Sequence, residues 1–214
     1  GQVFSYVWKN IAVYFPLLMG SALIVVLLYG VQSWVPTFLH RIHGWEHTRI
    51  GDQYGLVTLF AGSIGVISGP VVERYLTKLN VNAATIIVCL ISAIALTILG
   101  PITFLSLNSE LVLVGIFLVS FFITLPLALF ATSLQNVSPN QYRGGVSGIY
   151  VFTANIFGYG LGPMFVAFFT DKVFKSEMAI DLSMATIFLV CGPLSILIFY
   201  FGRKPFAKAL VMKT

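Results

Sequence analysis

Long uncharged stretches alternate with short clusters of charged residues along the whole chain. The uncharged runs cover residues 10–39, 53–72, 79–109, 111–142, 144–170 and 182–202, and none is shorter than 20 residues. A helix rises about 1.5 Å per residue, so about 20 apolar residues cross a hydrocarbon layer about 30 Å thick. The pattern therefore predicts six transmembrane helices within residues 1–214, at about 11–37, 52–75, 80–105, 110–136, 144–170 and 182–203.

The composition supports the same conclusion. Hydrophobic residues make up 58% of the chain and charged residues 9%, whereas about a quarter of the residues in soluble domains are charged. Lipid offers no hydrogen-bond partner to the backbone, so only helices and closed barrels cross it, and a barrel strand needs only about 9–11 residues. We therefore expect an all-α, polytopic membrane protein and exclude a soluble fold.

Lysine and arginine are distributed unevenly between the two ends of the predicted helices. One end collects eight of them: Lys9, Arg74, Lys78, Arg143, Arg203, Lys204, Lys208 and Lys213. The other end holds four: Arg41, Arg49, Lys172 and Lys175. Since cytoplasmic loops carry the basic excess, both termini are predicted to be cytoplasmic, in a multi-pass protein of the inner membrane with lipids as neighbours. The net charge of +5 is then explained without a nucleic-acid partner.

A six-residue pattern occurs twice. Gly65 to Pro70 and Gly158 to Pro163 both read G-x-x-x-G-P, and the two copies lie 93 residues apart in the second and fifth predicted helices. These helices run in opposite directions, so the pattern predicts a 3+3 inverted repeat. The alternative is a pair of unrelated packing faces, because glycines four apart let membrane helices approach closely. The proline suits either a gate or a static kink.

Several longer motifs resemble a known family. They include Tyr29-Gly-Val-Gln-Ser-Trp, Pro139-Asn140 followed by Arg143-Gly144, and Gly158-x-Gly160-Leu-Gly162-Pro163. Together they resemble the carboxy-terminal half, helices seven to twelve, of major facilitator transporters, in particular the bacterial Spinster-like proteins that adjoin the anion:cation symporters. The resemblance implies half of a twelve-helix transporter whose partner is its own amino-terminal half. The start at Gly1 rather than Met also indicates a longer or processed protein.

The resemblance also implies residues for conformational gating. The cytoplasmic signature of the superfamily, G-x-x-x-D-R, is present in a degenerate form as Gly69, Glu73 and Arg74, with Tyr75 and its neighbours replacing the later glycine and basic positions. In the family this loop latches the two halves together. The gating set is Gly69, Pro70, Glu73, Arg74, Arg143, Gly162 and Pro163. The alternative is an ordinary loop with a positive-inside charge.

Polar side chains within the helices are the candidates for substrate contact. Tyr29, Gln32, Ser33 and Pro36 fall on one face of the first helix. The fourth helix offers Thr124, Thr132 and Gln135, and the fifth offers Asn155 and Tyr159. By the resemblance, these side chains line the central cavity and hydrogen-bond a small-molecule substrate; contacts between helices are the alternative. Asn155 is the strongest candidate, because a primary amide at membrane depth needs a polar partner.

Other chemistries lack the residues they need. No charged residue lies deep in a predicted helix, so a proton relay would have to come from the other half. His40, His43 and His47 could share a helical face, but they lack a carboxylate or thiolate complement, and no metal site is predicted. The glycines from 158 to 162 lie inside a predicted helix, without the strand of a dinucleotide site. Neither a cofactor nor enzymatic activity is expected, because hydrolase and zinc-protease motifs are lacking.

The sequence therefore favours the carboxy-terminal half of a secondary transporter that moves a small organic solute or amphiphile by alternating access. A non-transporting membrane scaffold or assembly subunit with the same fold is the alternative, because a fold does not by itself fix a function.

Overall fold

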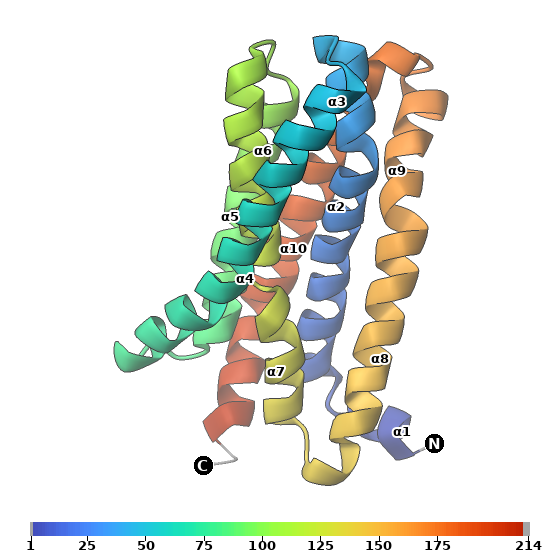
Figure 1. Cartoon of the computed structure of the whole chain (residues 1–214). Helices are drawn as coiled ribbons and strands as arrows, with labels where there is room; N and C mark the ends of the chain where they lie inside the picture. Colours follow the sequence, from blue (N-terminus) through green and yellow to red (C-terminus); the bar gives the residue numbers. More distant parts are fainter. Residues whose placement is uncertain (1, 212–214) are drawn as a thin grey trace.

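Six long helical crossings run the length of the molecule, as the computed structural model shows for residues 2–211 (Figure 1). The first three crossings are α2 (Ile11–His43), the continuous stretch α3 (His47–Arg49), η1 (Ile50–Tyr54) and α4 (Gly55–Lys78), and then α5 (Ala84–Phe104). All six are long and apolar enough to cross a membrane. The predicted all-α fold with six crossings is confirmed, and the chain is a multi-pass membrane protein.

The second set of three crossings is less regular. The fourth consists of α6 (Ser109–Thr124) and α7 (Leu127–Val137). The fifth consists of η2 (Asn140–Tyr142), α8 (Arg143–Asn155), η3 (Ile156–Leu161), α9 (Gly162–Phe168) and η4 (Phe169–Val173). The sixth consists of η5 (Glu177–Ala179) and α10 (Ile180–Val211). Both η3 and η4 are π-helical turns, so the fifth crossing is one rod with two locally widened segments.

The helix boundaries differ from the expected ones for identifiable reasons. The first crossing continues past residue 37 to His43 and stops at Gly44, whose positive φ of 65° lets its N–H bond the His40 carbonyl oxygen at 3.1 Å. The last crossing continues from 203 to Val211. A charged residue limits the part of a helix that can lie in hydrocarbon, but it does not end the helix. Helix ends predicted from the positions of charged residues are therefore too early.

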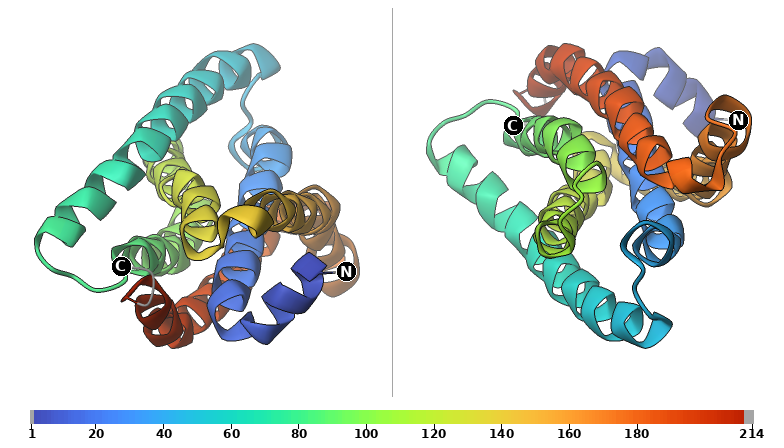
Figure 2. Two further views of the ribbon diagram at one scale, coloured as in Figure 1. Left: turned by 90° about the horizontal axis from the view of Figure 1, so that it is seen from below. Right: turned by 90° about the horizontal axis from the view of Figure 1, so that it is seen from above.

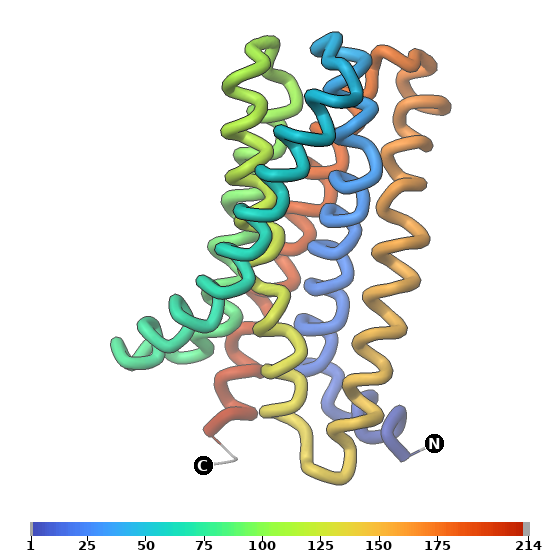
Figure 3. Tube along the Cα trace, in the orientation of Figure 1, coloured from blue at the N-terminus to red at the C-terminus, as the bar shows by residue number. Residues whose placement is uncertain are grey.

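The fourth crossing is broken near its middle, where the sequence predicted one helix over 110–136. Pro126 follows the end of α6 and has no N–H to continue the ladder, so α7 restarts with Leu129 and Phe130 both donating to the Pro126 carbonyl oxygen. Figure 3 traces this crossing as one path through the junction.

A short helix that the sequence did not predict precedes the first crossing. Helix α1 (Gln2–Lys9) is too short to span a membrane but is amphipathic. Its Tyr6 ring stacks on Tyr142 with centroids 4.7 Å apart, while Phe4 and Trp8 are 70% and 77% exposed. Both described ends of the chain lie at the same end of the bundle (Figure 1), called the terminal end below.

The third and sixth crossings form the back of the molecule. Helix α10 packs along α5 and α2, and α6 packs on α4 and α5. Views along the bundle place α4 and the α8–α9 rod on two flanks, with α10 and α5 together on another side (Figure 2). This arrangement leaves α2 and the α6–α7 crossing between the two flanks.

The two G-x-x-x-G-P copies make equivalent contacts. A side chain at Gly65 would overlap the Phe121 carbonyl oxygen of α6 at 2.6 Å, and one at Gly69 would overlap that of Leu125. A side chain at Gly162 would meet the Val26 carbonyl oxygen of α2 at 2.8 Å. The glycines of the second crossing thus pack on the fourth, and those of the fifth pack on the first. An inverted repeat exchanges the first crossing with the fourth and the second with the fifth, so it relates these two contacts. The predicted inverted repeat is therefore confirmed.

Ion pairs close the end of the bundle opposite the termini. Arg41 at the end of α2 pairs with Glu177 at 3.3 Å, and Arg49 of α3 pairs with Glu110 of α6 at 3.4 Å. The Arg49 guanidinium also lies 3.8 Å from the centre of the Trp45 ring. These contacts join three connections that the charge pattern assigned to one side.

Candidate functional site

The second and fifth crossings present broad apolar faces that nothing in the described chain covers. Only 17% of the most apolar window is buried in each of them, against 44% to 61% in the other four. The exposed side chains include Leu59, Phe60, Ile67 and Val71 of α4 and Phe152, Met164 and Phe168 of α8–α9. Faces of this extent mark either a lipid boundary or an interface with another bundle. Two cavities lie on the surface between these flanks.

The first cavity, the Asn155 cavity, lies between α2, α7 and α8. It has a volume of about 220 Å³ and is lined by Val25, Leu28, Tyr29, Leu127, Tyr150, Val151, Ala154 and Asn155. The structure thus brings together two side chains that the sequence selected from different helices, Tyr29 and Asn155. The close approach of α8–η3 to α2 at Gly158 makes this possible, because a side chain there would lie 2.7 Å from the Tyr29 ring.

The polar groups of the Asn155 cavity are only partly satisfied within the bundle. Asn155 Nδ2 donates to the Val151 carbonyl oxygen one turn earlier, at 2.8 Å. Within residues 2–211 its Oδ1 accepts no hydrogen bond, and the residue is exposed. The Tyr159 ring lies against Tyr29 with centroids 3.8 Å apart, but Tyr159 itself does not line the cavity. The cavity therefore offers one amide oxygen in aromatic surroundings.

The second cavity, the Gln32 cavity, lies between α2, η1–α4 and α6. It has a volume of about 130 Å³ and is lined by Leu28, Val31, Gln32, Tyr54, Thr58, Gly62, Ser120, Ile123 and Thr124. Thr58 Oγ1 is buried near the Tyr54 hydroxyl and makes no hydrogen bond of regular geometry. The Thr124 hydroxyl instead donates to the Ser120 and Phe121 carbonyl oxygens of its own helix, at 2.9 and 3.2 Å. Gln32 and Thr58 are thus the groups in this cavity that a ligand or water can satisfy.

The two cavities are related by the inverted repeat. One uses the first, fourth and fifth crossings and the other the first, second and fourth, and Leu28 lines both. Neither lining contains a charged residue or a histidine. The two linings therefore offer only apolar surface, aromatic rings and neutral hydrogen-bonding groups.

Four of the sequence-selected residues do not line either cavity: Tyr159, Ser33, Thr132 and Gln135. Ser33 is exposed on α2 beside Gln32. The Thr132 hydroxyl donates to the Ala128 and Leu129 carbonyl oxygens, both at 3.1 Å. Gln135 lies at the end of α7, where its Nε2 is 3.5 Å from Ser147 Oγ.

Sequence reasoning missed four polar lining residues: Tyr54, Thr58, Ser120 and Tyr150. A signal for two of them exists, because Tyr54, Thr58 and Gly62 are spaced four apart and continue the face of Gly65 and Gly69 towards the start of the second crossing. Ser120 and Tyr150 carry no such signal. Only the packing of α6 and α8 places them at the cavities.

The two charged residues of the degenerate loop signature are in different surroundings. The Glu73 carboxylate accepts a hydrogen bond from the Thr85 hydroxyl at the start of α5, and Ser133 Oγ of α7 lies 3.3 Å from the same Thr85 oxygen. Arg74 is exposed. Glu73 is therefore engaged inside this bundle, whereas Arg74 is accessible to an outside partner.

The remaining gating candidates lie at helix junctions. Arg143 Nε donates to the Gln135 carbonyl oxygen at 3.1 Å and so caps the end of α7 from the start of α8. Trp34 Nε1 donates to the Pro163 carbonyl oxygen at 3.0 Å, directly after the π-helical η3 segment. Pro70 follows Gly69 at the contact with the broken fourth crossing.

The three histidines do not converge on one point. His40 and His47 stack with ring centroids 4.7 Å apart, and His40 Nδ1 lies 3.0 Å from the Trp45 carbonyl oxygen. His43 faces the other way, with Nδ1 3.3 Å from Ser109 Oγ. His40 thus contacts the loop after α2, and His43 contacts the start of α6.

Comparison with known proteins agrees with this architecture. The model of the Major Facilitator Superfamily matches residues 2–163. An MFS-type efflux pump of Mycolicibacterium smegmatis is 26% identical over 175 residues, which cover 81% of this chain and 40% of the pump. These matches point to a transporter rather than an enzyme.

Two solved structures share the fold. Both are of a bacterial homolog to the human lysosomal transporter Spinster in an inward-facing conformation. The unoccupied form has a TM-score of 0.64 at 15% identity and the occupied form 0.62 at 17% identity. The alignments cover 98% and 92% of this chain, but only 50% and 49% of those chains. The chain therefore spans half or less of the length of its relatives. With a family match over residues 2–163 and six crossings arranged as an inverted repeat, the chain belongs to the Major Facilitator Superfamily.

Proposed function

We propose that this chain forms the carboxy-terminal half of a secondary transporter that moves a small organic solute or amphiphile across the membrane by alternating access. The observation that carries the proposal is the surface between α4 and α8–α9. There, two uncharged cavities with unsatisfied polar groups lie between two uncovered apolar flanks.

The proposed partner is the amino-terminal six-helix half of the same protein. Packing that half against the exposed faces of α4 and α8–α9 would cover their apolar side chains and enclose the two cavities at the junction. Transporters of this class bind substrate near the midplane between repeats and expose it to each side in turn by rocking one bundle against the other. The accessible Arg74 is then available to pair across the junction.

The cavity linings suggest what this half recognises. Because they carry aromatic and aliphatic side chains, hydroxyls and amides but no charge, this half contacts an uncharged portion of the substrate. Any ionic group of the substrate, and the coupling ion, would bind to the other half. The efflux activity named for one relative supports export as the direction to test first. We further propose that the protein lies in the inner membrane with both described ends cytoplasmic, in accordance with the basic excess there.

The test is solute flux in proteoliposomes that contain the full-length protein carrying this chain. Ethidium serves as the probe for an organic cation and an NBD-labelled lysophospholipid as the probe for an amphiphile. Asn155→Ala and Gln32→Ala each remove one cavity amide, and we expect each to raise KM by about five-fold, the equivalent of one neutral hydrogen bond. Gln141→Ala, which removes an exposed amide from the η2 turn, is the matched control and should leave KM unchanged.

Two results would argue against the proposal. If neither probe moves through folded wild-type protein, the non-transporting scaffold becomes the better description. If flux is present and both cavity variants match the Gln141→Ala control, the transporter assignment stands but the cavities are not its substrate site.

A further inference from the structure

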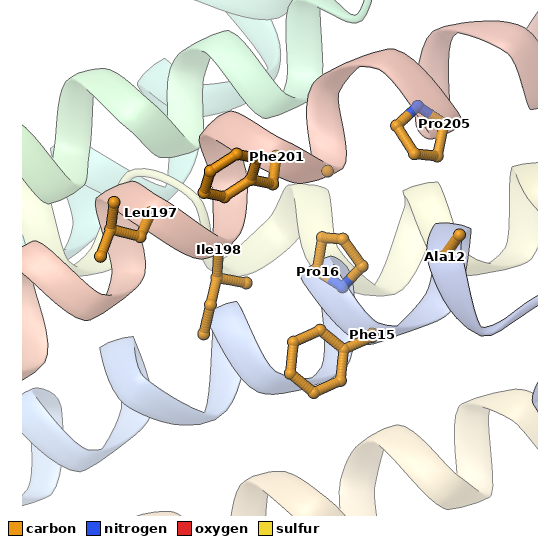
Figure 4. Close-up of a pocket in the computed structure, with 8 residues that line it drawn as sticks. Ala12, Phe15, Pro16, Leu197, Ile198, Phe201 and Pro205 are labelled. Atoms are coloured by element: carbon orange, nitrogen blue, oxygen red, sulfur yellow. The ribbon is translucent and has the colours of Figure 1, made fainter.

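A groove separate from the two cavities lies between the first and last crossings, at the terminal end of the bundle. It has a volume of about 340 Å³. Figure 4 shows Phe15 and Pro16 of α2 on one side and Leu197, Ile198, Phe201 and Pro205 of α10 on the other. At its floor the helices touch, because Gly202 has no side chain and lies directly against the Pro16 ring.

The lining of the groove is entirely apolar and open to the surroundings of the bundle. Phe15 is 45% exposed and Phe201 is 71% exposed, so the two rings stand as walls and are not part of the core. Both helices belong to crossings that are long and apolar enough to span a membrane. A groove surrounds an extended hydrocarbon chain on more sides than a convex helix surface does, and therefore holds it with more contacts.

Positive charge lies where the groove reaches the terminal end. Leu197, Phe201 and Pro205 recur every four residues along α10, and on the same face the next turn presents Lys208, with Lys204 beside it. Both lysines are exposed. Lys9, the last residue of α1, precedes Ala12 of the lining by three residues in the chain. The last 30 described residues, from 182 to 211, contain no acidic residue to offset these charges.

We propose that this groove is a binding site for an anionic glycerophospholipid of the adjoining leaflet. One acyl chain occupies the groove between α2 and α10, and the phosphate of the headgroup contacts Lys204 and Lys208. Basic residues at the membrane surface, next to a gap between transmembrane helices, provide both features that anionic lipids need. The groove is separate from the proposed substrate site, since none of its lining residues belongs to either cavity.

Native mass spectrometry of the delipidated full-length protein tests this proposal without any transport measurement. Phosphatidylglycerol and phosphatidylcholine with identical acyl chains are titrated separately. We expect phosphatidylglycerol to bind more tightly, and Lys204→Gln with Lys208→Gln to reduce its affinity by more than five-fold, since each lysine near an anionic surface contributes about that factor. Lys172→Gln with Lys175→Gln, at the opposite end of the bundle, is the charge-matched control and should have no effect.

A second variant tests the groove itself. Ala12→Phe places a ring in the apolar lining and should weaken phosphatidylglycerol binding although every lysine remains. Ile98→Phe enlarges a 54% exposed side chain on α5, outside the groove, and should leave binding unchanged. The thermal melting temperature of each variant, measured without lipid, establishes that it is folded. Equal affinity for the two lipids, or equal binding by Ala12→Phe and Ile98→Phe, would overturn the proposal.

Discussion

The indole Nε1–H of Trp34 donates a hydrogen bond to the backbone oxygen of Pro163, 3.0 Å away and 129 residues later in the chain. The bond joins α2 to the start of α9, directly after the π-helical η3 segment and Gly162. Wide π-helical turns and proline both weaken a helix locally. The bond therefore fixes the orientation of the fifth crossing at its least regular point.

Replacing Trp34 with phenylalanine should destabilise the protein by at least about 1 kcal/mol, because one part-buried hydrogen bond is lost together with the five-membered ring that carries it. Thermal unfolding of the full-length protein in detergent measures the effect. Trp8→Phe is the control, since Trp8 is 77% exposed, and its effect should stay below about 0.5 kcal/mol. Equal shifts for the two variants would show that the bond contributes nothing to stability.

Alanine at Gly158 should be destabilising where alanine at Gly160 is not. Both positions lie in η3 and receive the same gain in helix propensity of about 1 kcal/mol. A side chain at Gly158 would crowd Val25 and Tyr29. A Cβ atom at Gly160 would have no neighbouring atom within 4 Å among the described residues. We expect Gly158→Ala to unfold at a lower temperature than Gly160→Ala, by the equivalent of about 1–3 kcal/mol.

The inverted repeat predicts the same contrast in α4. Gly65→Ala would meet the Phe121 carbonyl oxygen at 2.6 Å, while a side chain at Gly62 has its nearest neighbour, Thr124, at 3.9 Å. The melting temperature of Gly65→Ala should fall below that of Gly62→Ala. If both α4 variants behave alike, close contact at Gly65 is not needed for the packing of α4 on α6.

Thr58 offers a variant that separates ligand binding from stability. Its Oγ1 is buried without a hydrogen bond of regular geometry, so Thr58→Val removes a poorly satisfied group at nearly constant shape and should leave unfolding unchanged or raise stability by about 1 kcal/mol. If the hydroxyl contacts substrate, KM for the transported probe rises at the same time. A stabilised variant with unchanged KM would remove Thr58 from the site.

The contact of Glu73 with Thr85 should contribute to stability at the terminal end of the bundle. Thr85→Val removes the donor to the Glu73 carboxylate and the link to Ser133, and we expect a loss of about 1.5–3 kcal/mol, because a charged acceptor is involved. Thr77→Val is the control, since that exposed hydroxyl only donates to the Glu73 backbone oxygen, at 2.9 Å. Unfolding of both variants in the same detergent provides the comparison.

The cavities were only partly predictable from the sequence. Tyr29, Gln32, Thr124 and Asn155 could be selected because polar groups in long apolar helices are costly unless they face protein or water. Thr132 and Gln135 satisfied the same criterion but bond within or beside α7. Polarity identifies the residues that must avoid lipid, but it does not distinguish a cavity from a helix contact.

The six crossings, their alternating direction and the inverted repeat were determined by the sequence alone. Solvation by lipid acts on each stretch of about 20 residues separately, and the two glycine–proline patterns are visible without knowledge of any contact. The tertiary structure decided the rest: the break at Pro126, the docking of α1 through Tyr6, the pairing of Glu73 with Thr85, and the meeting of Tyr29 with Asn155. Each of these depends on which helix faces pack together, and such contacts between distant segments leave no periodic trace in the chain.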